Sequence, residues 1–129
     1  MKNNKYYRVY AEINLDAIVK NVDNLMALTK ENTGALAVVK ADGYGHGDVA
    51  VAKAVAQKVT GYAVATLDEA VNLRENGVKK PILVLGYVDP YEFDILVSHE
   101  ITATVFDVET AQLLADAARV QKKQAHCHI

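Results

Sequence analysis

From residue 35 onward the sequence alternates short, mainly apolar runs with amphipathic segments, and this alternation limits the fold more than any other feature. Continuous apolar runs bounded by turn residues are typical of strands buried on both faces, as in a parallel sheet covered by helices. The predicted strands are residues 35–39, 61–65, 81–86, 101–106 and 124–129. The chain is therefore predicted to have an α/β fold in which helices join parallel strands.

Helix signals fill the intervals between these strands. Thr66 and Glu69 have the spacing of a capping box, and Asp89 stands before Pro90 in the order that favours a helix start. A further N-cap is predicted at Asn14. The predicted helices are residues 15–30, 48–59 and 67–76, with two more that begin after the caps Asp89 and Asp107.

Two further features concern the chain ends and the architecture. The first helix is expected to close at residues 31–34, with Gly34 in the left-handed conformation that ends many helices. Residues 8–14 alternate loosely between apolar and polar side chains and are predicted to form a strand. The length of the repeating strand–helix unit fits a (β/α) barrel. A doubly wound open sheet fits the same pattern, and hydrophobic periodicity does not separate the two architectures.

Lys40 directly follows the first apolar run and stands before the segment Gly-Tyr-Gly-His-Gly of residues 43–47. A neutral lysine amine forms Schiff bases with carbonyl compounds, and desolvation at the end of a buried strand lowers the pKa of a lysine. Glycines let the backbone approach an anion closely, and the helix that starts after Gly47 is expected to offer free N–H groups to it. Tyr44 adds a hydroxyl donor. Lys40 is therefore a candidate nucleophile beside a candidate anion-binding loop.

Each of these features also has a purely structural explanation. A single lysine at a strand end is commonly a solvated edge residue, and alternating glycines are common in plain turns. His46 fits a hydrogen bond to the backbone of the loop as well as it fits a catalytic role. The combination of lysine, glycines and tyrosine in one short segment is what favours a functional site.

Residues 38–47 resemble the pyridoxal-phosphate attachment motif of the alanine racemase family, and weaker similarity extends over nearly the whole chain. The resemblance implies that Lys40 binds the cofactor, pyridoxal 5'-phosphate, as a Schiff base and acts as a catalytic base. It also implies that Tyr44 donates a hydrogen bond to the cofactor phosphate. Val38 and Leu85, expected on neighbouring strands, would line the cofactor.

The same resemblance implies a domain organisation. Residues 1–14 would belong, as a strand, to a second β domain, and residues 15–129 would form the amino-terminal portion of a (β/α)8 TIM-type barrel. Five strands are predicted from the Lys40 strand onward, whereas eight close such a barrel, so the chain is expected to be a fragment. The commoner form of the motif has asparagine and alanine where this chain has Asp42 and Gly43.

The activity implied by the resemblance is interconversion of L- and D-alanine, which supplies D-alanine for peptidoglycan. In the family a homodimer acts on a small amino-acid substrate, and a tyrosine from the partner subunit is the second base. The fragment alone is expected to be inactive, because removing members of a cooperating catalytic set costs most of the rate. Four alternatives stay open: a serine or broad-specificity racemase, a Schiff-base aldolase, a non-catalytic pyridoxal-phosphate-binding barrel protein, and a structural fragment without activity.

Composition narrows the classes of partner. Apolar residues make up 51% of the chain and charged residues 23%, which is typical of a globular protein. The formal net charge is −2 and no basic cluster stands out, so nucleic acid and anionic membranes are poor candidates. No apolar run approaches the roughly 20 residues of a membrane helix, and the amino terminus lacks the apolar core of a signal peptide. With the single cysteine, Cys127, these features predict a soluble cytoplasmic protein.

A metal site is a weaker possibility near the carboxyl end. In a strand, His126 and His128 would share one face, which suits a metal ion. Two ligands do not make a site, and the sequence offers no evident third one. His99 is expected near a helix C-terminus, where a stabilising role is sufficient.

Overall fold

The computed structural model describes residues 9–129 and contains one five-stranded sheet in which all the strands are parallel. The strands are β1 (Leu36–Val38), β2 (Gly61–Val64), β3 (Ile82–Val84), β4 (Thr102–Thr104) and β5 (His126–His128). Each lies inside one of the five strands predicted from the apolar runs and is shorter than that run. The sheet is therefore made of the predicted segments, and the first and last residues of those segments lie in loops.

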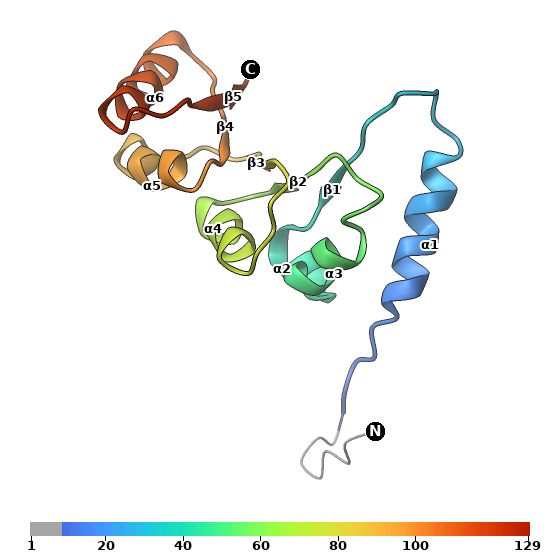
Figure 1. Cartoon of the computed structure of the whole chain (residues 1–129). Coiled ribbons are helices and arrows are strands. Elements are labelled where there is room, and N and C mark those ends of the chain that lie inside the picture. Colours follow the sequence, from blue (N-terminus) through green and yellow to red (C-terminus); the bar gives the residue numbers. More distant parts are fainter. Residues whose placement is uncertain (1–8) are drawn as a thin grey trace.

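The order of the strands decides between the two architectures that periodicity left open. The strands lie in the order β1-β2-β3-β4-β5, so each strand pairs with its predecessor in the chain. In Figure 1 the helices α3 to α6 lie along one side of this row of strands. A doubly wound sheet reverses its strand order and carries helices on both faces, whereas a barrel does neither. The fold is therefore the amino-terminal portion of a TIM-type (β/α) barrel.

Helix caps appear where the sequence predicts them. The helices are α1 (Leu15–Met26), α2 (Lys40–Gly45), α3 (Asp48–Ala54), α4 (Leu67–Glu75), the 3-10 turn η1 (Pro90–Glu92), α5 (Phe93–Ser98) and α6 (Val108–Val120). The Asn14 side chain accepts a hydrogen bond from the backbone of Ala17 at 3.0 Å, and Asp107 accepts one from Thr110 at 2.7 Å. Thr66 and Glu69 form both bonds of the predicted capping box.

Two predicted helix ends are wrong. The first helix stops at Met26, and the left-handed residue in the loop after it is Asn32 rather than Gly34. Gly34 is needed for a close approach instead, because a Cβ there would lie 2.6 Å from the Thr60 hydroxyl oxygen. The helix predicted over 48–59 stops at Ala54. After it, backbone N–H groups bond to the carbonyl three residues earlier, as in a 3-10 helix.

The strand predicted over residues 8–14 is not present in residues 9–14, and residue 8 lies outside the described part of the chain. A strand requires a hydrogen-bonded neighbour, and in the described sheet the strands β1 to β5 pair only with one another. The assignment of residues 1–14 to a second domain stays a prediction. No helix in the described residues is long and apolar enough to cross a membrane.

The two faces of the sheet have different surroundings. Side chains two residues apart share a face of a strand. On the outer face, Tyr62, Val64, Ile82 and Val84 are fully buried beneath the helices, and the Tyr62 hydroxyl donates to the carbonyl of Ala52 in α3 at 2.6 Å. Burial raises the pKa of Tyr62, so this hydroxyl stays a donor at neutral pH. The core of the described chain therefore lies between the sheet and its outer helices.

The inner face is exposed only at its two ends and changes from apolar to polar across the sheet. The pairing register places Val38, Ala63, Leu83, Thr102 and His126 in one row across the strands. Val38, at one end of this row, is 44% exposed, and His126, at the other end, is also exposed. The apolar end of the row belongs to the strand that leads into Lys40.

Long cationic side chains join the loops at the amino-terminal ends of the strands. The Arg74 guanidinium donates to four backbone carbonyls in the loops that enter β3 and β4: Val78 at 2.6 Å, Lys80 at 3.1 Å, His99 at 2.9 Å and Glu100 at 3.0 Å. The Lys80 amine donates to the carbonyl of Val59 before β2, and Lys123 donates to Ser98 before β4 at 2.8 Å. These bonds hold adjacent loops together at the edge opposite to Lys40.

The segment α2 is not a right-handed helix. Residues 41–44 have φ values from +52° to +60° and ψ values from 36° to 53°, which is one turn of left-handed helix. Three of these residues, Ala41, Asp42 and Tyr44, carry side chains that make this conformation costly. The glycines of the motif do take positive φ as predicted, at +60° for Gly43, +81° for Gly45 and +87° for Gly47.

Replacing Arg74 by lysine is expected to lower the free energy of unfolding by about 1–3 kcal/mol, because an ammonium group cannot reproduce a four-bond fork to carbonyls. Urea denaturation measures the change. The matched control is Arg119→Lys, since Arg119 makes an exposed pair with Asp116 and this substitution is expected to change stability by less than about 0.5 kcal/mol. Equal effects of the two substitutions would contradict the role given to Arg74.

Replacing Gly43 by alanine is expected to cost about 1–2 kcal/mol, because alanine is strained at φ +60° and its Cβ would lie 3.3 Å from the Asp48 nitrogen. Gly45→Ala is the control, since Gly45 has φ +81° but nothing within 4 Å of an added Cβ. The difference between the two denaturation midpoints measures the packing contribution. A Gly43→Ala protein as stable as the parent would mean that the left-handed turn does not form in solution.

Candidate functional site

Lys40 lies at the carboxyl-terminal end of β1. Barrel enzymes carry their active sites at the carboxyl-terminal ends of their strands. The last bond of the β1–β2 ladder runs from the Val39 nitrogen to the Ala63 oxygen at 2.9 Å, and the left-handed turn begins two residues later. Val39 is buried, whereas Lys40 is half-buried. The strand therefore ends in a lysine that lies between the core and solvent.

The Lys40 amine is not engaged in an ion pair within the described residues. The salt bridges of this part of the chain join Lys58 to Asp23 at 2.8 Å and Arg119 to Asp116 at 2.5 Å. A lysine held in a tight ion pair is less available as a nucleophile, because the pair favours the charged amine. Within the described residues, the Lys40 amine takes part in neither of these two ion pairs.

The other predicted cofactor residues lie at the same edge. Tyr44 is on the left-handed turn and is 60% exposed, and Leu85 directly follows β3 and is 44% exposed. The expectation that Val38 and Leu85 lie on neighbouring strands is wrong, since Val38 pairs with Ala63 of β2 and Ala63 pairs in turn with Leu83 of β3. Because parallel strands twist and their side chains alternate, both apolar side chains still belong to the inner face.

The histidine of the motif bonds the backbone. Nδ1 of His46 lies 3.1 Å from the oxygen of Gly43 and 3.2 Å from the oxygen of Tyr44, and a proton on Nδ1 donates to these carbonyls. The structural explanation for His46 is therefore confirmed. The Gly43 carbonyl also accepts the backbone N–H of His46 at 3.1 Å, so His46 holds the end of the turn through both its backbone and its ring.

The expected anion site at the start of α3 is wrong. The backbone nitrogen of Asp48 donates to Oδ1 of Asp42 at 3.1 Å, and that of Val49 donates to Oδ1 of Asp48 at 2.6 Å. Oδ2 of Asp48 accepts a bond from the Asn72 amide of α4 at 2.9 Å. Two carboxylates therefore occupy the helix start, and they tie the turn to α3 and α4 instead of leaving donors for a ligand.

Glu69 has a second role that its local sequence does not indicate. One oxygen, Oε1, accepts a bond from the backbone of Ala41 at 2.7 Å, and the other, Oε2, accepts from Ala65 at 2.8 Å and from Thr66 at 3.3 Å. The spacing of Thr66 and Glu69 predicts only that Glu69 caps the helix. No local signal connects it to Ala41, which lies 28 residues earlier in the chain.

The charge of Glu69 is stabilised by its neighbours. Desolvation by burial raises the pKa of this carboxyl, but the three backbone N–H bonds and the charge of Lys40 together outweigh it and bring the pKa below its usual value. The carboxylate is therefore ionised near neutral pH and accepts all three bonds. Lys40 is the cation that contributes to this stabilisation.

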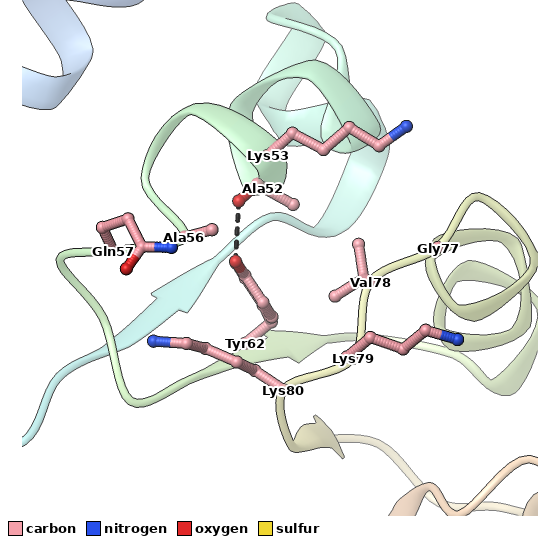
Figure 2. Close-up of a pocket in the computed structure, with 9 residues that line it drawn as sticks. All are labelled: Ala52, Lys53, Ala56, Gln57, Tyr62, Gly77, Val78, Lys79 and Lys80. Atoms are coloured by element: carbon pink, nitrogen blue, oxygen red, sulfur yellow. Dashed lines mark hydrogen bonds between the residues drawn. The ribbon is translucent and has the colours of Figure 1, made fainter.

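A cavity of about 290 Å³ lies elsewhere, between α3 and the loop that enters β3. Figure 2 shows the Lys53 and Lys79 amines extending away from the space around Tyr62 and Val78. The Tyr62 hydroxyl and the Lys80 amine are already bonded to backbone carbonyls. None of the predicted site residues Lys40, Tyr44, Val38 and Leu85 lines this cavity, so it is not the candidate active site.

The metal hypothesis gains no support. Residues 9–129 contain no group of three histidine, cysteine or acidic side chains that could hold a metal ion. His126 and His128 are both exposed on the edge strand β5, and the single cysteine, Cys127, is a free, exposed thiol. Among the described residues, the candidate site that remains is the group of residues around Lys40 at the carboxyl-terminal end of β1.

Comparison with known proteins agrees with this geometry. Residues 13–129 match the family described as alanine racemase, N-terminal domain. Alanine racemase 1 of Bacillus subtilis is 44% identical over all of this chain, and alanine racemase 1 of Oceanobacillus iheyensis is 41% identical over all of it. The solved alanine racemase of Clostridium difficile 630 superposes on 96% of the chain with a TM-score of 0.93 and 40% identity.

The chain spans only part of these relatives. It covers 33% of the Bacillus subtilis protein, 35% of the Oceanobacillus iheyensis protein and 33% of the Clostridium difficile structure. In each comparison, nearly the whole of this chain is matched, and the matched family is an amino-terminal domain. By sequence and by fold, the chain belongs to the alanine racemase family.

Proposed function

We propose that this chain contributes the cofactor-binding lysine of a pyridoxal-phosphate-dependent racemase that interconverts L- and D-alanine. The observation that carries the proposal is the position of Lys40: a half-buried amine outside any ion pair of the described residues, at the carboxyl-terminal edge of a parallel sheet. The printed names of the relatives, which are alanine racemases, support the substrate.

The side chains around Lys40 suit pyridoxal phosphate. The aldehyde of this cofactor requires an amine, its ring requires apolar contacts and its phosphate requires donors. Lys40 offers the amine, the exposed side chains of Val38 and Leu85 offer apolar surface, and the Tyr44 hydroxyl offers a donor. The chemistry of this set of residues therefore fits the cofactor.

In the proposed reaction the bound cofactor withdraws electrons from the substrate α-carbon. Lys40 has two roles, first holding the cofactor and then, as a free amine, taking or returning the α-proton at Nζ. Val38 and Leu85 exclude water beside the ring, and Tyr44 orients the phosphate. A tyrosine from a partner subunit of a homodimer is proposed as the base on the opposite face.

The proposal extends to the cellular setting. The substrate is a small amino acid, the product D-alanine serves peptidoglycan, and the reaction takes place in the cytoplasm. Residues 1–14 are proposed to belong to a second, β-rich domain. The racemase names of the relatives and the absence of a membrane-spanning helix in residues 9–129 support this setting.

Titration with pyridoxal phosphate, followed by borohydride reduction and peptide mapping, is expected to give one major adduct, on Lys40, because this half-buried lysine lies at the carboxyl-terminal end of β1 with Tyr44 in the turn that follows. Lys40→Arg should abolish the near-visible absorbance change and the adduct. Lys58→Arg is the control, since Lys58 pairs with Asp23 on α1 and should bind normally. Adducts scattered over surface lysines, with none favoured, would reject the proposal.

Replacing Tyr44 by phenylalanine is expected to weaken binding of pyridoxal phosphate about tenfold, which corresponds to the loss of one hydrogen bond to a charged group. Pyridoxal, which lacks the phosphate, is the matched ligand and should bind the parent and the variant equally. Absorbance titrations of both ligands measure this. An equal loss for the two ligands would show that the Tyr44 hydroxyl does not contact the phosphate.

A further inference from the structure

The Glu69 carboxylate links the carboxyl-terminal ends of two neighbouring strands. Its oxygen Oε1 accepts from Ala41, the residue directly after Lys40, and its oxygen Oε2 accepts from Ala65, the residue directly after β2. Glu69 itself lies in the first turn of α4. One side chain therefore connects the lysine peptide, the adjacent strand and the following helix.

The bond to Ala41 is made where the backbone has left its regular pattern. The ladder between β1 and β2 ends with Val39, and the left-handed turn starts at Ala41. The Ala41 nitrogen belongs to the peptide plane whose carbonyl comes from Lys40, so fixing this nitrogen fixes the plane. The orientation of Lys40 relative to β2 thus depends on the partner that Glu69 provides.

Helix capping does not account for this geometry. Of the three bonds that the Glu69 carboxylate accepts, only the one from the Thr66 backbone N–H belongs to the capping box, and at 3.3 Å it is the longest of the three. The shorter bonds, of 2.7 and 2.8 Å, go to Ala41 and Ala65 outside the helix. All three bonds are made to the same carboxylate, and the two shortest of them go to residues outside the helix, so the main role of this side chain lies outside the cap.

We propose that Glu69 is a positioning residue for Lys40. Its two oxygens hold the peptide after Lys40 against the end of β2, and this contact sets the place of the Lys40 amine at the edge of the sheet. The role rests on the proposed function, in which Lys40 binds the cofactor. Glu69 does not itself contact the reacting atoms, and it acts through the backbone.

The test compares Glu69→Gln with Thr66→Ala. Glutamine has one carbonyl oxygen and cannot accept from Ala41 and Ala65 in the manner of a carboxylate, whereas Thr66→Ala removes the cap hydroxyl and leaves Glu69 in place. Glu69→Gln is expected to bind pyridoxal phosphate about tenfold more weakly, and borohydride trapping on Lys40 is expected to slow at subsaturating cofactor. Thr66→Ala is expected to unfold at lower temperature with unchanged cofactor affinity.

Two outcomes overturn the proposal. Glu69→Gln could bind pyridoxal phosphate and trap on Lys40 as the parent does, which would mean that the carboxylate does not position the lysine. Alternatively, Thr66→Ala could weaken cofactor binding by the same factor, which would assign the effect to the helix cap.

A second readout needs no cofactor and separates this inference from the proposed function. Hydrogen exchange reports the Ala41 amide, and brief acetylation with acetic anhydride reports the reactivity of Lys40 relative to Lys58 in the same digest. Faster exchange and altered relative acetylation in Glu69→Gln alone are expected. If the parent forms no cofactor adduct on Lys40, the proposed function fails, yet these two measurements still support or overturn the positioning role.

Discussion

The sequential parallel pairing of the strands is the constraint on which the rest of the structure depends. Because each strand pairs with its predecessor in the same direction, the carboxyl-terminal ends of all strands lie on one side of the sheet and their amino-terminal ends on the other. Different side chains hold the loops on these two sides. Arg74 donates to the carbonyls of loops that enter β3 and β4, whereas Lys40 and Glu69 lie at the opposite edge. The bonds of Arg74 and the candidate site around Lys40 thus lie at opposite ends of the strands.

The left-handed turn after Lys40 is the most strained part of the described backbone. Non-glycine residues in this conformation each cost about 1–2 kcal/mol, so the turn persists only because its surroundings determine it. Asp42 bonds the start of α3, His46 bonds carbonyls of the turn, and Glu69 bonds its first amide. Strain of this kind is typical of sites where a side chain must be held in one place.

The acidic residues of this region act on the backbone and not on a ligand. Asp42 and Asp48 accept the first N–H groups of α3, and Glu69 accepts amides from two strand ends. A helix start filled by carboxylates does not attract a phosphate, so any anion beside Lys40 depends on other donors. Asp42 therefore has a structural partner in the backbone of α3.

The sequence by itself determined the strands, most helix starts and the candidate lysine, because these depend on local patterns: apolar runs, the caps at Asn14, Thr66 and Asp107, and the glycines after Lys40. Only the tertiary structure decided that β2 separates Val38 from Leu85, that Asp42 fills the start of α3, and that Glu69 reaches Ala41. These contacts depend on the order of the strands and on the left-handed conformation of residues 41–44. No local sequence pattern encodes these two features, since both follow from how the whole sheet packs.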